Sequence, residues 1–187
     1  MEDWDRLWKD TARLSQATAR SQVDDTIDQC LDLKLPWATR LAGILAILHQ
    51  VLGDDTGVSF YGVTRPWQPL VLVGAAGRPG ALATGWGVPV AGIAAQEQAA
   101  QFAGEVRTFA DYLGGWIGVH QCVAVPVLHN QHLYGVLEVR AYSPDYLNLA
   151  HAELVLAVGA RIAAAWPTNQ KTGGLEHANR STHERCP

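Results

Sequence analysis

Two segments near the start of the chain carry apolar residues at helical spacing. In residues 3–30 these residues recur at steps of three and four, with polar residues between them, which predicts an amphipathic helix. They are Trp4, Leu7, Trp8, Leu14 and Ala17. A second helical pattern runs over 37–52, and Gly53 fits its end. We expect each helix to cover an apolar surface with one face.

The hydrophobic period then changes to that of strands. Two β-rich runs, 57–64 and 70–75, flank a turn that contains two prolines, and this arrangement predicts an antiparallel pair. Six glycines in 74–92 predict an irregular loop, and an alanine-rich helix is expected over 90–101. Residues 105–109 alternate like an edge strand, and a loop or a single helical turn is expected over 110–116.

The second half of the chain contains the strongest hairpin signal. Two valine-rich runs, 122–128 and 133–142, are separated by four polar residues, and a final helix is expected over 148–166. Few apolar residues follow, which predicts a disordered tail over 167–187. The order of elements predicts an α+β domain over 36–166, with an antiparallel sheet, packed helices and a helical extension over 1–35.

Composition excludes several classes of protein. The chain has 187 residues, is 48% hydrophobic and has a net charge of -4, which argues against global disorder and against a basic nucleic-acid-binding surface. No apolar run reaches the roughly 20 residues that span a bilayer, and no secretory signal is visible. We therefore expect a cytoplasmic protein with neither nucleic acid nor membrane as a partner. Three cysteines without a CxxC spacing argue against a disulfide framework and a zinc knuckle.

Several of these segments together resemble a GAF domain over about residues 37–166. They are the hairpin runs 122–128 and 135–139, the upstream Gly85-Trp86-Gly87-Val88, and the end of the last helix at 162–165. The resemblance implies a six-stranded antiparallel sheet with helices on both sides and a small-ligand pocket between the sheet and the crossover loops. It also implies a sensory role, often with dimerisation through the terminal helices.

One branch of that family is catalytic, the free methionine-R-sulfoxide reductases. The resemblance implies cysteines in the glycine loop, at the start of the crossover helix and shortly before the hairpin. The matching positions 78–81, 88–89 and the neighbourhood of Gly115 contain none. Without a thiolate there, nothing attacks the sulfoxide sulfur. Of the pocket positions implied by the resemblance, only Tyr61 and Glu138 keep the expected chemistry.

Alternation in the last strand selects two candidate pocket residues. If Leu137 and Val139 pack beneath the helices, Glu138 and Arg140 face the opposite side of the sheet. There they either pair with each other or Arg140 receives an anionic ligand, and a solvated sheet face is the alternative. The full set of candidate ligand-binding residues is Tyr61, Trp86, Trp116, Cys122, Glu138 and Arg140.

Other polar and aromatic residues have simpler interpretations. Trp67 is expected to plug a turn, whereas Trp86 and Trp116 are expected to line the pocket. His120 lies two residues from Cys122 and shares its face, but no third ligand accompanies them, and His129 and His132 flank a turn. No catalytic constellation is visible, and we expect neither a metal nor a cofactor.

These observations favour a non-catalytic sensory domain. It would bind a compact anion or an amino-acid-like molecule and signal through its terminal helices to a partner protein. One alternative is an enzyme related to the reductases that uses Cys122 in altered chemistry. Another is a ligand-free dimerisation module whose pocket is filled by its own tryptophans. The apolar stripe of the first helix predicts a homodimer, unless that helix folds back onto its own sheet.

Overall fold

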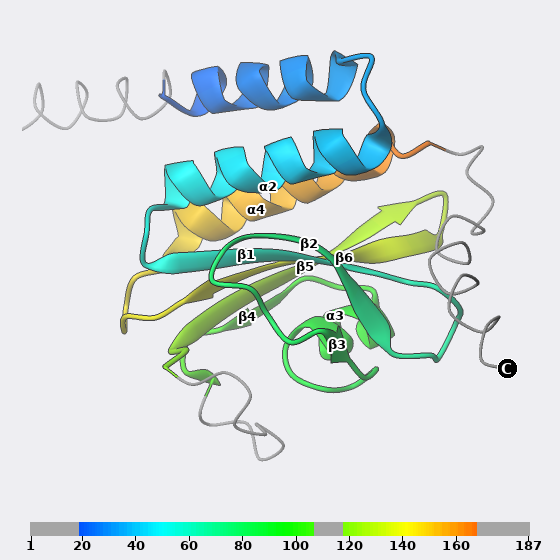
Figure 1. Ribbon diagram of the computed structural model, residues 1–187. Coiled ribbons are helices and arrows are strands. Elements are labelled where there is room, and N and C mark those ends of the chain that lie inside the picture. The colour runs from blue at the N-terminus through cyan, green and yellow to red at the C-terminus, as the bar shows by residue number, and fades with distance from the viewer. Residues whose placement is uncertain (1–18, 107–117, 168–187) are drawn as a thin grey trace, which may run out of the picture.

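The computed structural model describes residues 19–106 and 118–167. The strands are β1 (Thr56–Gly62), β2 (Leu70–Gly77), β3 (Ala83–Thr84), β4 (Gln101–Ala103), β5 (Gln121–His129) and β6 (His132–Ala141). The helices are α2 (Trp37–Leu52), α3 (Ala91–Glu97) and α4 (Leu149–Ala164), preceded by helical residues 19–32. The strands form one antiparallel sheet in the order β3-β2-β1-β6-β5-β4, with helices on both sides (Figure 1), which confirms the predicted α+β fold.

One face of the sheet is covered by α2 and α4, with residues 19–32 as an outer helical layer (Figure 1). The predicted apolar face of α2 is buried, and φ of +87° at Gly53 ends the helix. Val58 of β1 and Val139 of β6 belong to the apolar core beneath these helices. Burial of this face gives the fold its main apolar core. No described helix is long and apolar enough to cross a membrane.

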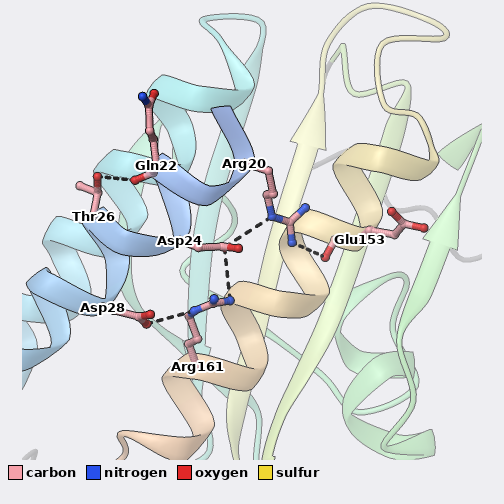
Figure 2. Close-up of polar contacts among 7 residues, drawn as sticks. All are labelled: Arg20, Gln22, Asp24, Thr26, Asp28, Glu153 and Arg161. Atoms are coloured by element: carbon pink, nitrogen blue, oxygen red, sulfur yellow. Dashed lines mark hydrogen bonds and ion pairs between the residues drawn. The ribbon is translucent and has the colours of Figure 1, made fainter. Parts of the chain in front are cut away.

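Residues 19–32 dock on the helical layer rather than on the sheet. Ile27 is fully buried in the core shared with α2 and α4. Arg161 of α4 bridges Asp24 at 3.3 Å and Asp28 at 3.0 Å, and Arg20 Nη2 donates to the Glu153 carbonyl (Figure 2). Residues 19–32 therefore pack against their own chain. The predicted apolar stripe from Trp4 to Ala17 lies outside the described residues.

The opposite face of the sheet is covered by α3 and the glycine-rich crossover. Phe60 and Tyr61 are consecutive on β1 and therefore point to opposite faces of the sheet. Phe60 packs in the core beneath α2 and α4, and Tyr61 packs with Ala94 of α3. A second cluster of buried residues, smaller than the first, lies on this side. The sheet is therefore buried on both faces, but by different kinds of cover.

Several local predictions need correction. The hairpin is confirmed, with its turn at Asn130 and Gln131, whose φ values are +49° and +62°. The edge strand expected at 105–109 is wrong where it can be tested, because Glu105 and Val106 lie outside any strand. The edge strand is instead β4, since α3 ends at Gln98 in a left-handed conformation and frees the following residues to pair with β5. Part of the loop expected over 74–92 also belongs to β2 and β3.

Some predicted segments lie outside the described residues. These are the loop at 110–116 and almost all of the tail, 168–187.

Candidate functional site

The candidate site is built on the centre of the sheet. β6 lies between β1 and β5, and its Leu137 and Val139 face the helical layer as predicted. Glu138 and Arg140 consequently face the α3 side, where their exposed fractions are 0% and 2%. The alternative of a solvated sheet face is therefore wrong. A buried ionisable pair at this position has to be compensated by partners or used for chemistry.

Arg140 is surrounded by acceptors of the protein itself. Its Nε lies 3.3 Å from Glu138 Oε2. Its Nη2 donates to Ser59 Oγ at 2.8 Å and to the Arg78 carbonyl at 2.9 Å, and its Nη1 donates to the Pro79 carbonyl at 3.1 Å. The predicted pairing with Glu138 therefore exists. The same guanidinium also holds the crossover loop that follows β2.

Glycines allow that loop to lie flat against the sheet. The Gly80 N–H donates to Ser59 Oγ at 3.2 Å. A Cβ at Gly80 would overlap Tyr61 Oη, and a Cβ at Gly57 would overlap the Arg78 carbonyl. Sequence reasoning missed Ser59, Gly57 and Gly80 as parts of the site. The available signal was the density of small residues in β1 and in the crossover loop.

Next to this loop lies a group of buried polar atoms. Tyr61, Cys122 and Glu138 are each 0% exposed. Tyr61 Oη and both carboxylate oxygens of Glu138 have no hydrogen-bond partner of good geometry among the described residues. The Cys122 thiol and the Ala91 N–H lie close enough to Glu138 to lower its pKa slightly, without reaching that geometry. Buried polar atoms without partners are uncommon in native proteins, so this group is the best candidate for ligand contact.

Burial also changes the acidity of these groups. Burial raises the pKa of Glu138 to about 7, although the charge of Arg140 opposes the change. Burial, and then the charge of Glu138, raise the pKa of the Cys122 thiol well above its usual range. The same two causes raise the pKa of Tyr61. At neutral pH the thiol and the phenol are therefore protonated, while the carboxyl group titrates near neutrality.

The aromatic candidates lie at the margin of this cluster or outside the described residues. Trp86 is half-buried against the cluster that contains Tyr61, and its Nε1 donates to the Gln68 carbonyl at 2.7 Å. Trp67 packs against Trp86 with ring centroids 5.1 Å apart and the two ring planes tilted by 41°, but 74% of Trp67 is exposed. The prediction that Trp67 plugs a turn is therefore wrong, because the indole covers its neighbour's ring rather than the sheet. Trp116 lies outside the described residues.

Three other features that could bind a ligand or a metal are the acidic and thiol side chains, the histidines of the hairpin, and an apolar groove. Within 19–106 and 118–167, no three His, Cys, Asp or Glu side chains gather as metal ligands. His129 and His132 pair across the hairpin turn, and the His132 ring packs edge-on against Tyr134. A groove of about 220 Å³ between β5 and α4 has an apolar lining that includes Val125 and Leu156 but none of the candidate residues.

The fold and the sequence identify the family. The sequence model of the family described as "GAF domain" matches residues 36–166. The chain belongs to the GAF domain family. This confirms the resemblance drawn from the hairpin and the glycine-rich segment. No curated protein matches the chain.

Solved structures with the same fold include both enzymes and GAF domains of other proteins. fRMsr of Staphylococcus aureus in its reduced form is 20% identical, with a TM-score of 0.71 over 79% of this chain and 95% of that chain. Free methionine-R-sulfoxide reductase from Neisseria meningitidis, in complex with its substrate, is 21% identical, with a TM-score of 0.68 over 80% of this chain and 91% of that chain.

A GAF domain from a phosphoenolpyruvate-protein phosphotransferase of Coxiella burnetii has a comparable TM-score at lower sequence identity. It is 15% identical, with a TM-score of 0.70 over 80% of this chain and 93% of that chain. At these identities the likeness establishes the fold alone. Function has to be argued from the site.

Proposed function

We propose that this GAF domain is a non-catalytic sensor that binds an amino-acid-like small molecule on the α3 face of its sheet. The observation that carries the proposal is a pair of buried groups, the Glu138 carboxylate and the Tyr61 hydroxyl, whose oxygens form no hydrogen bond of good geometry among the described residues, although Glu138 is ion-paired with Arg140. A ligand that donates to the carboxylate and bonds to the hydroxyl would satisfy both. Such compensation makes an otherwise costly arrangement favourable.

Charge balance favours a zwitterion over a compact anion. Glu138 and Arg140 together carry no net charge when both are ionised, so an added anion would leave the buried site with a net charge. A zwitterion places its ammonium against Glu138 and its carboxylate toward Arg140 without adding charge. The remaining candidates, Cys122 and Trp86, would supply apolar surface and a protonated thiol.

The proposal is tested by ligand titration of the full chain. Zwitterionic amino acids, including methionine and methionine sulfoxide, are compared with sulfate and phosphate by thermal shift and calorimetry. We expect binding of at least one zwitterion and its loss in Glu138→Gln, because the amide cannot pair with the ammonium. Glu97→Gln, which changes an exposed carboxylate, serves as the matched control. The sensor proposal fails if no amino acid shifts the transition and no small molecule co-purifies in native mass spectrometry.

A signal from the site would reach the terminal helices through β1. Phe60, next to Tyr61, stacks on Trp166 after α4, with ring centroids 5.6 Å apart. Trp166 also packs edge-on against Trp37 at the start of α2, at 4.9 Å. A displacement of β1 by a ligand would therefore shift Trp37 at the start of α2 and Trp166 after α4. A partner protein that contacts the terminal helices would detect this shift.

An enzyme related to the reductases is the second candidate, because several of the similar structures are such enzymes. Cys122 would have to be the nucleophile. Its thiol is fully buried and its pKa is raised well above the usual range, so little thiolate exists at neutral pH. We expect no turnover of free methionine sulfoxide with a thiol reductant. Turnover that Cys122→Ser abolishes would establish the enzyme instead.

We also propose a homodimer formed by the apolar stripe of residues 1–18. Ile27, in the helical residues 19–32, is buried in the chain's own core, so a useful truncation has to end before it. Removing residues 1–18 should convert a dimer into a monomer, as measured by light scattering. An unchanged mass would contradict the dimer. A dimer that binds nothing would support the alternative of a ligand-free dimerisation module.

A further inference from the structure

The crossover segment 78–80 binds Arg140 as a ligand would. The carbonyls of Arg78 and Pro79 accept from Nη2 and Nη1, the two outer nitrogens of the guanidinium. A carboxylate bound in the bidentate manner places its two oxygens against the same pair of nitrogens. The segment therefore presents to Arg140 the pair of acceptors that a carboxylate would present.

The segment is held from one side only. Arg78 and Pro79 are exposed to solvent on their outer surface, while their carbonyls point inward to the buried guanidinium. At Gly77, φ of +69° turns the chain away from β2 at the start of the segment. At its other end the Gly80 N–H donates to Ser59 Oγ. These polar contacts to β1 and β6 fasten the segment as a strap, together with the Arg78 guanidinium, which lies 4.3 Å from the centroid of the Tyr142 ring.

We propose that segment 78–80 is a built-in competitor of the site, whose two carbonyls occupy Arg140 until the carboxylate of a ligand displaces them. The inference rests on the proposed function, since it concerns how the same site admits an amino-acid-like molecule. It assigns a regulatory role to Gly80 and Ser59, which lie beside the site and fasten the strap. Ligand affinity would then depend on the stability of the closed strap as well as on direct contacts.

Strap release is measured on the ligand-free chain by amide hydrogen exchange. Gly80→Ala adds a Cβ that overlaps Tyr61 Oη, and Ser59→Ala removes the oxygen shared by Arg140 and the Gly80 N–H. Each variant should speed exchange of the Gly80 amide roughly tenfold or more, because this N–H is the donor that the strap bonds to Ser59 Oγ. Exchange in β5 should stay unchanged.

Two further variants separate strap release from general damage. Gly104→Ala is the matched control, because the nearest atom to its new Cβ lies at 3.7 Å, in ordinary contact. Tyr61→Phe combined with Gly80→Ala removes the overlapping hydroxyl and should restore much of the protection. Wild-type exchange of the Gly80 amide at an unprotected rate, or no change in Ser59→Ala, would overturn the strap.

Competition is measured with sodium acetate, a carboxylate without an ammonium group, at about pH 5.5. At this pH Glu138 is protonated, because its pKa is raised to about 7, and the acetate charge then balances that of Arg140. The acetate concentration that gives half of the maximal shift in the thermal transition should be at least fivefold lower in Gly80→Ala than in wild type. Equal midpoints, or no acetate effect in either protein, would overturn the competition. These arms require no amino acid, so the strap can stand if the amino-acid proposal fails, and the reverse also holds.

Discussion

The two faces of the sheet are buried in opposite ways. The face beneath α2 and α4 is packed with aliphatic and aromatic side chains, among them Phe60 and Leu137. The face beneath α3 contains Glu138 and Arg140, which are as deeply buried as those apolar residues. Replacing a buried ion pair by apolar residues is often neutral or stabilising, so an ion pair is weak evidence for stability. The comparison indicates that the apolar face holds the fold together, whereas the buried ion pair of the polar face adds little to stability.

The largest effect should come from the apolar face. Phe60→Ala removes a fully buried ring that stacks on Trp166, and it should lower the free energy of unfolding by about 3–5 kcal/mol. Because no ionisable group is changed, we expect a similar loss at pH 5 and pH 8 by urea unfolding. Phe102→Ala, at a ring that is 52% exposed, is the control and should stay within about 0.5 kcal/mol. A loss below 1 kcal/mol in Phe60→Ala would contradict the division between the faces.

A pH-dependent effect should come from the polar face. The pKa of Glu138 is raised to about 7 in the folded state, above its value in the unfolded chain. The folded state then binds more protons, so stability is fully present below the unfolded pKa and is lost as pH rises through 7. Between pH 5 and pH 8, wild type should lose about 3 kcal/mol relative to Glu138→Gln.

Exposed carboxylates provide the control for that measurement. Glu97→Gln should run parallel to wild type between pH 5 and pH 8 in the same urea titrations, because Glu97 is exposed. If Glu138→Gln also ran parallel to wild type, the carboxyl would be ionised in both states throughout this range. The burial of Glu138 would then make no pH-dependent contribution to the free energy of unfolding.

Sequence and structure agree most closely where periodicity governs burial. Alternation in β6 correctly assigned Leu137 to the helical layer and Glu138 to the opposite face, because side chains alternate along any strand. The contacts of the crossover strap could not be predicted in this way. They use the main-chain carbonyls of Arg78 and Pro79, and a carbonyl carries no side-chain signal in the sequence.

The misplaced edge strand has a similar cause. Alternation at 105–109 suggested a strand, but pairing is decided by where the preceding helix ends. Gln98 adopts φ of +50°, which ends α3 early and places Phe102 beside Val123 of β5. A left-handed residue that is not glycine gives little warning in the sequence.

Two tyrosine hydroxyls, one on each side of this comparison, should give stability changes of intermediate size. Tyr146 Oη donates to the Leu52 carbonyl at 2.7 Å, whereas Tyr61 Oη has no partner among the described residues. Tyr146→Phe should cost about 0.5–1.5 kcal/mol, the net worth of an ordinary hydrogen bond. Tyr61→Phe should be neutral or stabilising, because it removes a buried hydroxyl that nothing satisfies. A larger loss in Tyr61→Phe than in Tyr146→Phe, by urea unfolding, would show that the hydroxyl has a partner in the folded state.

The smallest effect should come from the ion pairs of the outer helical layer. Arg161→Gln removes the pairs with Asp24 and Asp28, which are partly exposed and therefore contrast with the buried Glu138 and Arg140 pair. Exposed pairs contribute about 0.2–1 kcal/mol and are screened by salt. The loss should therefore fall in this range in urea at low ionic strength and shrink in high salt. Arg65→Gln, in the exposed turn after β1, should show no loss. A loss well above this range that persists in high salt would mean that these pairs hold residues 19–32 in place, rather than the buried side chain of Ile27.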